Sequence, residues 1–196
     1  MGGTFDPIHY GHLLAAEEAR VQFLLDRVIF VPNGDPPHKR SYALTPAEHR
    51  YEMVVLATAS NPHFETSRVE VDRPGLSYSV DTVRGFREQF GAGVKLYFIT
   101  GADALLELAT WHQPDTLLEL CELIAVTRPG YSAGTVSGPL ARAPLDRVHL
   151  VSTMGVAISS TELRQRAAAG KSLRYLTPEP VVRYIERRGL YRAANG

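Results

Sequence analysis

The chain has 196 residues, 44% of them hydrophobic and 21% charged, and its 21 basic residues balance 21 acidic ones. This length and composition suit one globular domain, and the balanced charge argues against a broad basic surface for nucleic acid. We find no signal peptide and no apolar stretch long enough to span a bilayer, so we expect neither nucleic acid nor a membrane as a partner.

Cys121 is the only cysteine and lies within an apolar run, which is typical of a buried small hydrophobic residue. A single cysteine excludes a disulfide within one chain. We therefore expect a cytoplasmic protein, and the sequence leaves a homo-oligomer open.

Short apolar runs alternate along the chain with stretches of helical periodicity. The runs indicate buried strands at 28–31, 96–100, 123–127 and 148–152, and the periodic stretches predict helices at 13–25, 46–59, 80–90, 160–169 and 178–187. A weaker run at 69–71 suggests a further strand. At the second helix, Thr45 followed by Pro46 and Glu48 matches a capping residue, a proline at the first helical position and a capping box.

Strands that alternate with helices predict an α/β fold. We expect a single domain over residues 1–196, built on a doubly wound, Rossmann-like parallel sheet with helices on both faces and a small helical C-terminal region. In such sheets ligands bind at the carboxyl ends of the strands, so the polar motifs should gather there.

The first motif is GGTFDPIHYGH at residues 2–12, directly before an amphipathic helical pattern. Its leading glycines can adopt positive φ and let a phosphate approach backbone N–H groups, and Gly11 leaves space between His9 and His12. His12 falls at or near a helix N-terminus, which favours anions, so both imidazoles can donate to a phosphate. Two alternatives stay open: a metal-binding pair, which lacks a third ligand nearby, and a glycine-rich turn with incidental histidines.

Three middle segments place polar or aromatic residues at the junctions of predicted elements. Lys39, in a proline-rich loop, is either a mobile cation for a phosphate or a solvated side chain, and Ser79 stands where it could cap a helix. After the strand at 96–100, Gly101 leaves room for a ligand, while Asp103 caps the next helix or binds a ribose hydroxyl. Trp111 is the only tryptophan, and packing is its simplest role.

Residues 158–166, ISSTELRQR, form a second helix start rich in hydroxyl groups. Its hydroxyl and N–H groups can bind an anion, and Arg164 lies one turn further along, within reach of a phosphate held there. Plain N-capping is the alternative. Arg128, at the end of another strand, either lines a nucleotide site or lies on the surface.

GGTFDPIHYGH closely resembles the signature of the HxGH nucleotidyltransferase superfamily, in particular the bacterial nicotinate-nucleotide adenylyltransferases. The segments PPHK, SYSVDT, GADALLELATWHQ, TRPG and ISSTELRQR resemble the family's later motifs in the same order. Two departures stand out: Ser79 replaces a more usual threonine, and His112 replaces a frequent tyrosine.

The resemblance implies a role for each matching residue. His9, His12, Lys39 and Arg164 would act on the phosphates during catalysis. The ATP site would comprise Gly2, Gly3, Thr4, Phe5, Gly11, Gly101, Asp103, Ile158, Ser159, Ser160 and Thr161. The nicotinate nucleotide would be bound by Ser79, Trp111, His112 and Arg128, with Trp111 stacking on the pyridine ring.

The glycine motif would normally follow a central strand of about six residues, whose carboxyl end aims it. Here Met1 leads straight into Gly2. We therefore expect the central N-terminal strand to be missing from this sequence, and the natural protein to begin upstream.

The reaction implied is transfer of the adenylyl group of ATP to nicotinate mononucleotide, giving nicotinate adenine dinucleotide and pyrophosphate. Mg²⁺ is expected to accompany ATP, with no metal site made of protein ligands alone. Other acceptors, namely nicotinamide mononucleotide and phosphopantetheine, remain possible, as do cytidylyl transfer and a nucleotide sensor without turnover.

Overall fold

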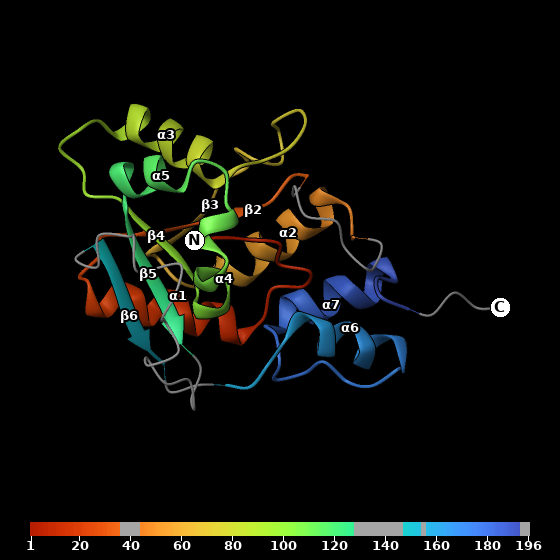
Figure 1. Cartoon of the computed structure of the whole chain (residues 1–196). Helices are drawn as coiled ribbons and strands as arrows, with labels where there is room; N and C mark the ends of the chain where they lie inside the picture. Colours follow the sequence, from red (N-terminus) through yellow and green to blue (C-terminus); the bar gives the residue numbers. More distant parts are fainter. Residues whose placement is uncertain (36–43, 128–146, 154–155, 193–196) are drawn as a thin grey trace.

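The computed structural model describes residues 1–35, 44–127, 147–153 and 156–192 (Figure 1). All pairings between its strands are parallel. The strands form two groups, ordered β1-β2-β3 and β4-β5-β6: β1 (Gly2–Gly3), β2 (Val28–Pro32), β3 (Phe64–Thr66), β4 (Tyr97–Gly101), β5 (Glu122–Thr127) and β6 (Val148–Ser152). Because β1 also lies against β4, the strands follow the order 3-2-1-4-5-6 across the molecule. This is the order of a doubly wound Rossmann sheet, which confirms the predicted fold class.

The helices connect the strands and cover both faces. They are α1 (Tyr10–Gln22), α2 (Ala47–Thr58), α3 (Ser79–Phe90), α4 (Ala102–Leu106), a 3₁₀ turn η1 (Leu108–Thr110), α5 (Pro114–Leu120), α6 (Ser160–Ala168) and α7 (Glu179–Arg188). Figure 1 shows α3 and α5 above the strands and α1 below them. None of the helices in the described part of the chain is long and apolar enough to cross a bilayer.

Strand β5 divides two hydrophobic cores, because successive side chains of a strand point to opposite faces. Leu123 and Ala125 pack with α3, α4 and α5, whereas Ile124 and Val126 pack with α1, α2, α6 and α7. Cys121 lies in the first of these cores, only 2% exposed, and its thiol donates to the Leu117 carbonyl at 3.3 Å. Burial raises the pKa of this thiol to about 12, so the cysteine is a buried small residue as the sequence predicts.

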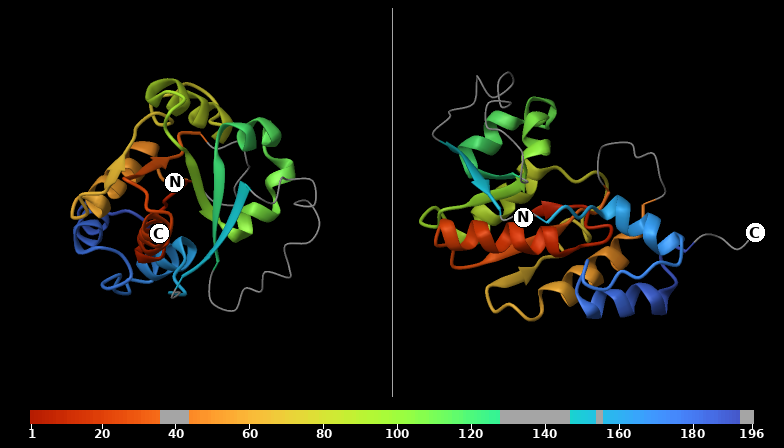
Figure 2. Two further views of the ribbon diagram at one scale, coloured as in Figure 1. Left: turned by 90° about the vertical axis from the view of Figure 1, so that its left-hand side faces the viewer. Right: turned by 90° about the horizontal axis from the view of Figure 1, so that it is seen from below.

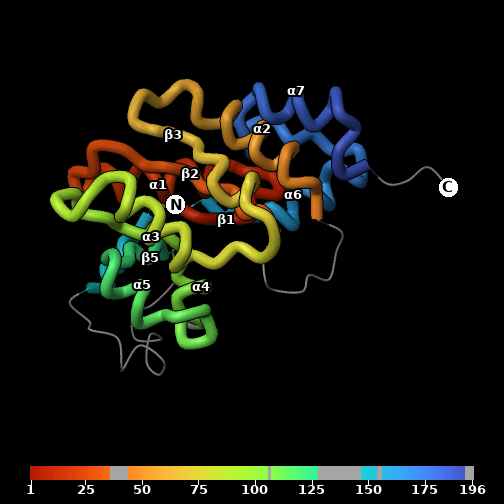
Figure 3. Tube along the Cα trace, turned by 90° about the horizontal axis from the view of Figure 1, so that it is seen from above, coloured from red at the N-terminus to blue at the C-terminus, as the bar shows by residue number. Residues whose placement is uncertain are grey.

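Helices α6 and α7 form a C-terminal layer at one end of the molecule, as Figures 2 and 3 show. Helix α7 packs against α2, and Val181, Val182 and Ile185 of α7 join the core shared with α1. The predicted small helical C-terminal region is confirmed.

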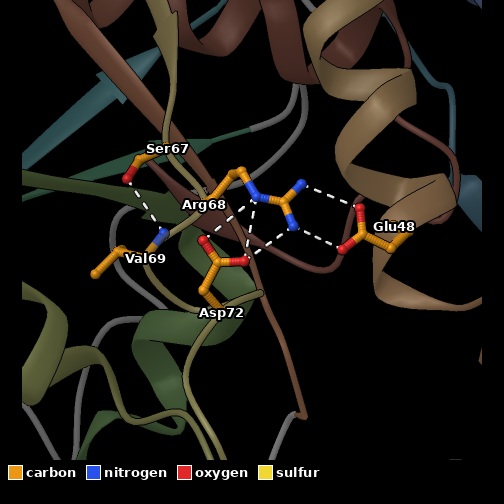
Figure 4. Close-up of polar contacts among 5 residues, drawn as sticks. All are labelled: Glu48, Ser67, Arg68, Val69 and Asp72. Carbon is orange, nitrogen blue, oxygen red and sulfur yellow. Dashed lines mark hydrogen bonds and ion pairs between the residues drawn. The ribbon is translucent and has the colours of Figure 1, made fainter.

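The predicted capping box at the start of α2 is wrong. Pro46, not Thr45, is the residue that precedes the helix, and no side chain caps it. The Glu48 carboxylate is engaged elsewhere: it accepts from Arg68 at 2.6 and 3.0 Å (Figure 4). Glu48 therefore forms an exposed ion pair with Arg68 and no capping bond.

The strand predicted at 69–71 is also wrong, since a turn occupies these residues. Ser67 Oγ accepts from the Val69 N–H at 3.3 Å (Figure 4). The Asp72 N–H donates to the Arg68 carbonyl at 2.9 Å. These local bonds satisfy backbone groups that a strand would need for pairing. The edge strand β3 precedes this turn and was not predicted, because three residues are too few for a periodic signal.

The split between buried and exposed positions gives a direct test of the core. We expect Leu123→Ala in β5, where leucine is fully buried, to lower the free energy of unfolding by about 3 kcal/mol. Leu150→Ala in the neighbouring strand β6 is the matched control, because Leu150 is 40% exposed, and it should cost below about 1 kcal/mol. Urea unfolding measures the free energy of unfolding of both variants. Equal losses would contradict the burial of β5 between the two hydrophobic cores.

Candidate active site

A cavity of about 200 Å³ opens at the carboxyl ends of the parallel strands. Its walls come from the start of the chain, the first turns of α1, the ends of β4 and β5 and the segment before α6. They include Gly2, Gly3, Phe5, His9, Gly11, His12, Thr100, Gly101, Val126, Thr127, Thr153 and Ile158. Eight residues predicted for the phosphate and ATP sites thus share one cavity, which is where the fold class places ligands.

The two histidines form a stacked pair at the start of α1. His9 is the residue before the helix, and His12 lies in its first turn. Their ring centroids are 3.8 Å apart with an angle of 23° between the planes, and the His9 backbone N–H donates to His12 Nδ1 at 3.2 Å. Since Nδ1 of His12 accepts, its ring proton lies on Nε2 in this arrangement. His12 therefore presents a donor at the tip of its ring, at a helix N-terminus that favours anions.

The glycines of this segment serve close packing rather than unusual backbone angles. A Cβ on Gly11 would lie 3.0 Å from two atoms of the His9 ring, and a Cβ on Gly3 would lie 2.8 Å from the Phe5 ring. Neither Gly2 nor Gly3 has positive φ, because both lie in β1, whereas Phe5 has φ 51°. The space that the sequence predicts at Gly11 is present. The His9 ring fills this space, which does not lie between the two histidines as predicted.

The chain between β1 and α1 is tied to distant parts of the molecule through its carbonyl groups. Ser160 Oγ donates to the Pro7 carbonyl at 2.9 Å, and Arg164 donates to the Asp6 carbonyl at 2.8 Å. Thr177 Oγ1 donates to the Ile8 carbonyl at 2.8 Å. Three anchors from the C-terminal part of the chain therefore fix the approach to the histidine pair.

The Asp6 side chain, which is only 1% exposed, anchors this segment further. Its carboxylate accepts from the Tyr191 hydroxyl at 2.7 Å and from the Thr45 N–H at 3.4 Å. Burial and the neighbouring carboxylate raise the pKa of Tyr191, so this tyrosine stays a neutral donor.

Arg50 completes the support from α2 and is also only 1% exposed. Its guanidinium donates to the carbonyls of Thr45, Thr4 and Gly34 at 2.8, 2.9 and 3.0 Å. A buried arginine needs such partners, and a planar guanidinium can serve several carbonyls at once. Our sequence analysis missed this role, although Arg50 precedes Met53, Val54 and Ala57 at the spacing of a buried helix face.

The start of α6 lies beside the start of α1. An ideal Cβ on Gly11 would be 3.7 Å from the Ile158 carbonyl, and Ile158 lines the same cavity as both histidines. Ser159 caps α6 by accepting from the Glu162 N–H at 3.2 Å. Arg164 donates to Thr161 Oγ1 at 3.2 Å within α6 and to the Asp6 carbonyl ahead of α1. The approach of Gly11 to Ile158 and the bond to Asp6 bring the two helix starts together at this edge of the sheet.

Three of the four residues predicted for the nicotinate nucleotide, Ser79, Trp111 and His112, lie on another part of the structure. Ser79 is the first residue of α3, and the Tyr78 and His112 rings lie 4.4 Å apart between centroids. Trp111 packs edge-on against Phe98 at 5.7 Å. A Cβ added to Gly2 would lie 3.2 Å from the Phe98 ring, so this aromatic group lies against β1.

Two capping alternatives considered for these segments are wrong. Tyr78 precedes α3 and Gly101 precedes α4, and neither helix has a side-chain cap. Asp103 is exposed in the first turn of α4, and a Cβ on Gly101 would meet nothing within 4 Å. Space for a ligand is therefore present beside Gly101.

Lys39 and Arg128 lie outside the described residues. Their predicted roles stay predictions. The described ranges contain no group of three or more histidine, cysteine, aspartate or glutamate side chains that could hold a metal ion.

The chain is similar to known proteins over almost its whole length. Residues 1–166 match the family model described as cytidylyltransferase-like. The chain is 56% identical over 195 residues to a protein of Moorella thermoacetica named "Probable nicotinate-nucleotide adenylyltransferase", covering 98% of this chain and 90% of the relative. A protein of the same name from Salinispora arenicola is 51% identical, with 97% and 99% covered.

Solved structures show the same fold. The nicotinic acid mononucleotide adenylyltransferase of Plasmodium falciparum, solved in complex with NaAD, superimposes with a TM-score of 0.79. The two chains are 18% identical, and the match covers 97% of this chain and 94% of the other. A second structure of that protein, in complex with APC, gives a TM-score of 0.76 at the same identity and coverage.

Arg50 allows a test of how the glycine and histidine segment is held. Arg50→Met keeps the apolar stem but leaves three partly buried carbonyls without these donors, so we expect a loss of about 3 kcal/mol in the free energy of unfolding. The matched control is Arg183→Met, because the Arg183 side chain is 70% exposed and pairs with Glu179 on the surface of α7. Similar stability of the two variants in urea unfolding would show that the Arg50 anchor is dispensable.

Proposed function

The chain belongs to the cytidylyltransferase-like family and to the nicotinate-nucleotide adenylyltransferases, and from this premise we propose which residues carry the reaction. The enzyme transfers the adenylyl group of ATP to nicotinate mononucleotide, forming nicotinate adenine dinucleotide and pyrophosphate in NAD biosynthesis. The observation that supports the site assignment is the shared cavity: the histidine pair, the ends of β4 and β5 and the segment before α6 all line it.

In this proposal the phosphates of ATP lie between the starts of α1 and α6. Both histidine rings donate to the phosphates, His12 from Nε2, and the two rings stack on each other. The His9 backbone N–H bonds His12 Nδ1 and so holds the orientation of the His12 ring. Gly2, Gly3, Thr4 and Phe5 form the cradle, and Gly11, Ile158, Ser159, Ser160 and Thr161 supply the two helix starts. A chain of zero net charge can concentrate positive potential there because helix dipoles and N–H groups act locally.

The chemistry needs positioning and charge stabilisation more than proton transfer. The phosphate of the mononucleotide is already an anion at neutral pH, so it can attack the α-phosphorus in line without a general base. Donors that face the developing charge lower the barrier most, and this is the role we assign to His9, His12, Lys39 and Arg164. Arg164 also holds the Asp6 carbonyl, so it would couple the second helix start to the first.

The nicotinate nucleotide is assigned to Ser79, Trp111, His112 and Arg128. Trp111 offers a ring for the pyridine to stack on, and the Ser79 hydroxyl and the His112 backbone N–H offer donors for the carboxylate. Gly101 leaves the open space between this group and the histidine cavity, and Asp103 is assigned to a ribose hydroxyl.

We propose that Mg²⁺ enters with ATP, held mainly by phosphate oxygens and water, as its octahedral preference favours. When bound it would neutralise charge on the phosphates. We further propose a cytoplasmic enzyme that works as a single domain over residues 1–196, and a homo-oligomer stays a prediction.

The histidine pair gives the sharpest test of the catalytic assignment. We expect His12→Ala and His9→Ala each to lower kcat about 100-fold or more, the size of one lost transition-state donor. Pyrophosphate release with ATP, Mg²⁺ and nicotinate mononucleotide measures this. His63→Ala, an exposed histidine whose ring bonds the Asp26 carbonyl, is the control and should keep kcat. Near-normal turnover in both test variants would contradict the mechanism.

The choice of substrate tests the site assigned to the nicotinate nucleotide and distinguishes the proposed reaction from the alternative ones. We expect Ser79→Ala to lower kcat/KM for nicotinate mononucleotide more than for nicotinamide mononucleotide, since a lost donor weakens binding of the carboxylate. The same assay with CTP in place of ATP, or phosphopantetheine as acceptor, should give little pyrophosphate. Equal effects of Ser79→Ala on the acid and the amide would remove Ser79 from the specificity site.

A further inference from the structure

A buried carboxylate, that of Glu70, joins β2 to α3 and has no role in the mechanism described above. Glu70 lies in the turn that follows β3 and is only 3% exposed. Its side chain accepts from the Thr82 hydroxyl at 2.7 Å and from the Asn33 side-chain amide at 3.0 Å. Thr82 lies in α3, and Asn33 directly follows β2. One side chain therefore connects two elements that are far apart in sequence.

The bond to Asn33 leads toward the glycine and histidine segment. The Asn33 backbone N–H donates to the Gly3 carbonyl at 2.9 Å, and Gly3 lines the cavity of the histidines. The next residue, Gly34, packs so closely that a Cβ there would lie 2.0 Å from the Glu70 carbonyl oxygen. The backbone of Glu70 therefore lies directly against the carboxyl end of β2, at the edge of the sheet where the site is.

The bond to Thr82 leads to the start of α3. The Thr82 N–H donates to the Tyr78 carbonyl at 3.3 Å, within the first turn of the helix that begins at Ser79. The Thr82 hydroxyl also accepts from Arg73 at 3.1 Å while it donates to Glu70, and the two bonds together fix its direction. The first turn of α3, which carries Ser79, is therefore attached to Glu70 through Thr82.

The turn that carries Glu70 is also held on its exposed side. Arg68 pairs with Glu48 of α2 at 2.6 Å and with Asp72 at 2.9 Å (Figure 4). The Arg68 guanidinium lies over the Tyr51 ring of α2 as well, 4.6 Å from its centroid. Each exposed contact contributes little alone, but together they attach the turn to α2. Glu70 therefore projects from a turn whose position is fixed.

The chemistry of a carboxylate suits this place, although its burial is unfavourable. Burial raises the pKa of Glu70, while the hydrogen bonds from Thr82 and Asn33 and the charge of Arg73 act in the opposite direction. An apolar side chain would avoid the desolvation of a charge, but it could not bind two donors. The two oxygens of Glu70 accept from different sides, Oε1 from Thr82 and Oε2 from Asn33.

We propose that Glu70 is a positioning residue of the nicotinate nucleotide site. It holds the first turn of α3, and with it Ser79, at a set position relative to the glycine and histidine segment. A mononucleotide bound at Ser79 then meets the phosphates of ATP in line. Glu70 contacts neither substrate and acts through Thr82 and Asn33. This inference rests on the proposed role of Ser79 as a donor to the nicotinate carboxylate.

Thr82→Val tests the link, because it removes the bond between α3 and Glu70 and keeps a side chain of similar shape. We expect the KM for nicotinate mononucleotide to rise about 10-fold, as for one lost hydrogen bond to a charged group, and the KM for ATP to stay within about twofold. The preference for nicotinate over nicotinamide mononucleotide, measured as a ratio of kcat/KM values, should fall, since a displaced Ser79 no longer meets the carboxylate.

The matched control is Thr58→Val in α2. Thr58 and Thr82 are both 4% exposed, and the Thr58 hydroxyl donates to the Val54 carbonyl at 2.9 Å. Both variants lose a buried hydroxyl bond, so urea unfolding should show a loss of stability in each. Only Thr82→Val should change the KM for nicotinate mononucleotide. If both variants change this KM equally, the link acts on stability alone and the proposal is overturned.

Two variants of Glu70 itself separate hydrogen bonding from mere volume. In Glu70→Gln the amide oxygen can still accept from Thr82, and Asn33 can rotate its own amide so that its oxygen accepts from the new NH₂ group. We expect Glu70→Gln to keep the KM for nicotinate mononucleotide within about threefold and Glu70→Ala to raise it about 10-fold or more. An unchanged KM in Glu70→Ala would overturn the proposal, and Thr82→Val decides the matter if Glu70→Ala does not fold.

Amide hydrogen exchange gives a readout that does not depend on activity. Protection of the Asp81 and Thr82 amides, which both bond the Tyr78 carbonyl, should fall in Thr82→Val and stay unchanged in Thr58→Val. Unchanged protection in Thr82→Val would show that the first turn of α3 does not depend on Glu70.

Ser79→Ala distinguishes failure of this inference from failure of the proposed site. If Ser79→Ala lowers the preference for the acid and Thr82→Val does not, the site assignment stands and the role of Glu70 is wrong. If Ser79→Ala leaves that preference unchanged, the assignment of Ser79 is wrong, and the positioning role that rests on it fails as well.

Discussion

The segment between β1 and α1 is the constraint on which the site depends. Its carbonyl groups are held by Arg50 from α2, by Ser160 and Arg164 from α6 and by Thr177 near α7. Each of these donors is fixed by its own helix or turn, so the segment has little freedom. The positions of the stacked histidines at its end are therefore fixed by parts of the chain more than 40 residues away.

This support also explains how a protein of zero net charge can bind a highly charged substrate. The starts of α1 and α6 meet at one cavity, and both direct backbone N–H groups and dipoles toward the same edge of the sheet. Several of the hydroxyl and guanidinium groups there bond the protein's own backbone. In the proposed mechanism their contribution is to keep the donors in place before ATP arrives, which is how preorganised sites lower a barrier.

Much of the fold could be predicted from the sequence because parallel strands are short apolar runs. Residues 148–152 form β6 as predicted, and 123–127 form all but the first residue of β5. The failures have local causes: Glu48 bonds Arg68 rather than capping α2, and Ser67 stabilises a turn where a strand was expected at 69–71. Helix α5 was missed because seven residues give too weak a periodic signal.

The sequence by itself determined the fold class, the longer strands and helices and the histidine motif, because these follow from local periodicity and from residues adjacent in the chain. Only the tertiary structure decided that Arg50, Thr177 and Tyr191 belong to the support of that motif. The physical reason is that these hydrogen bonds join residues far apart in sequence. No local pattern indicates which carbonyl a buried guanidinium will bind.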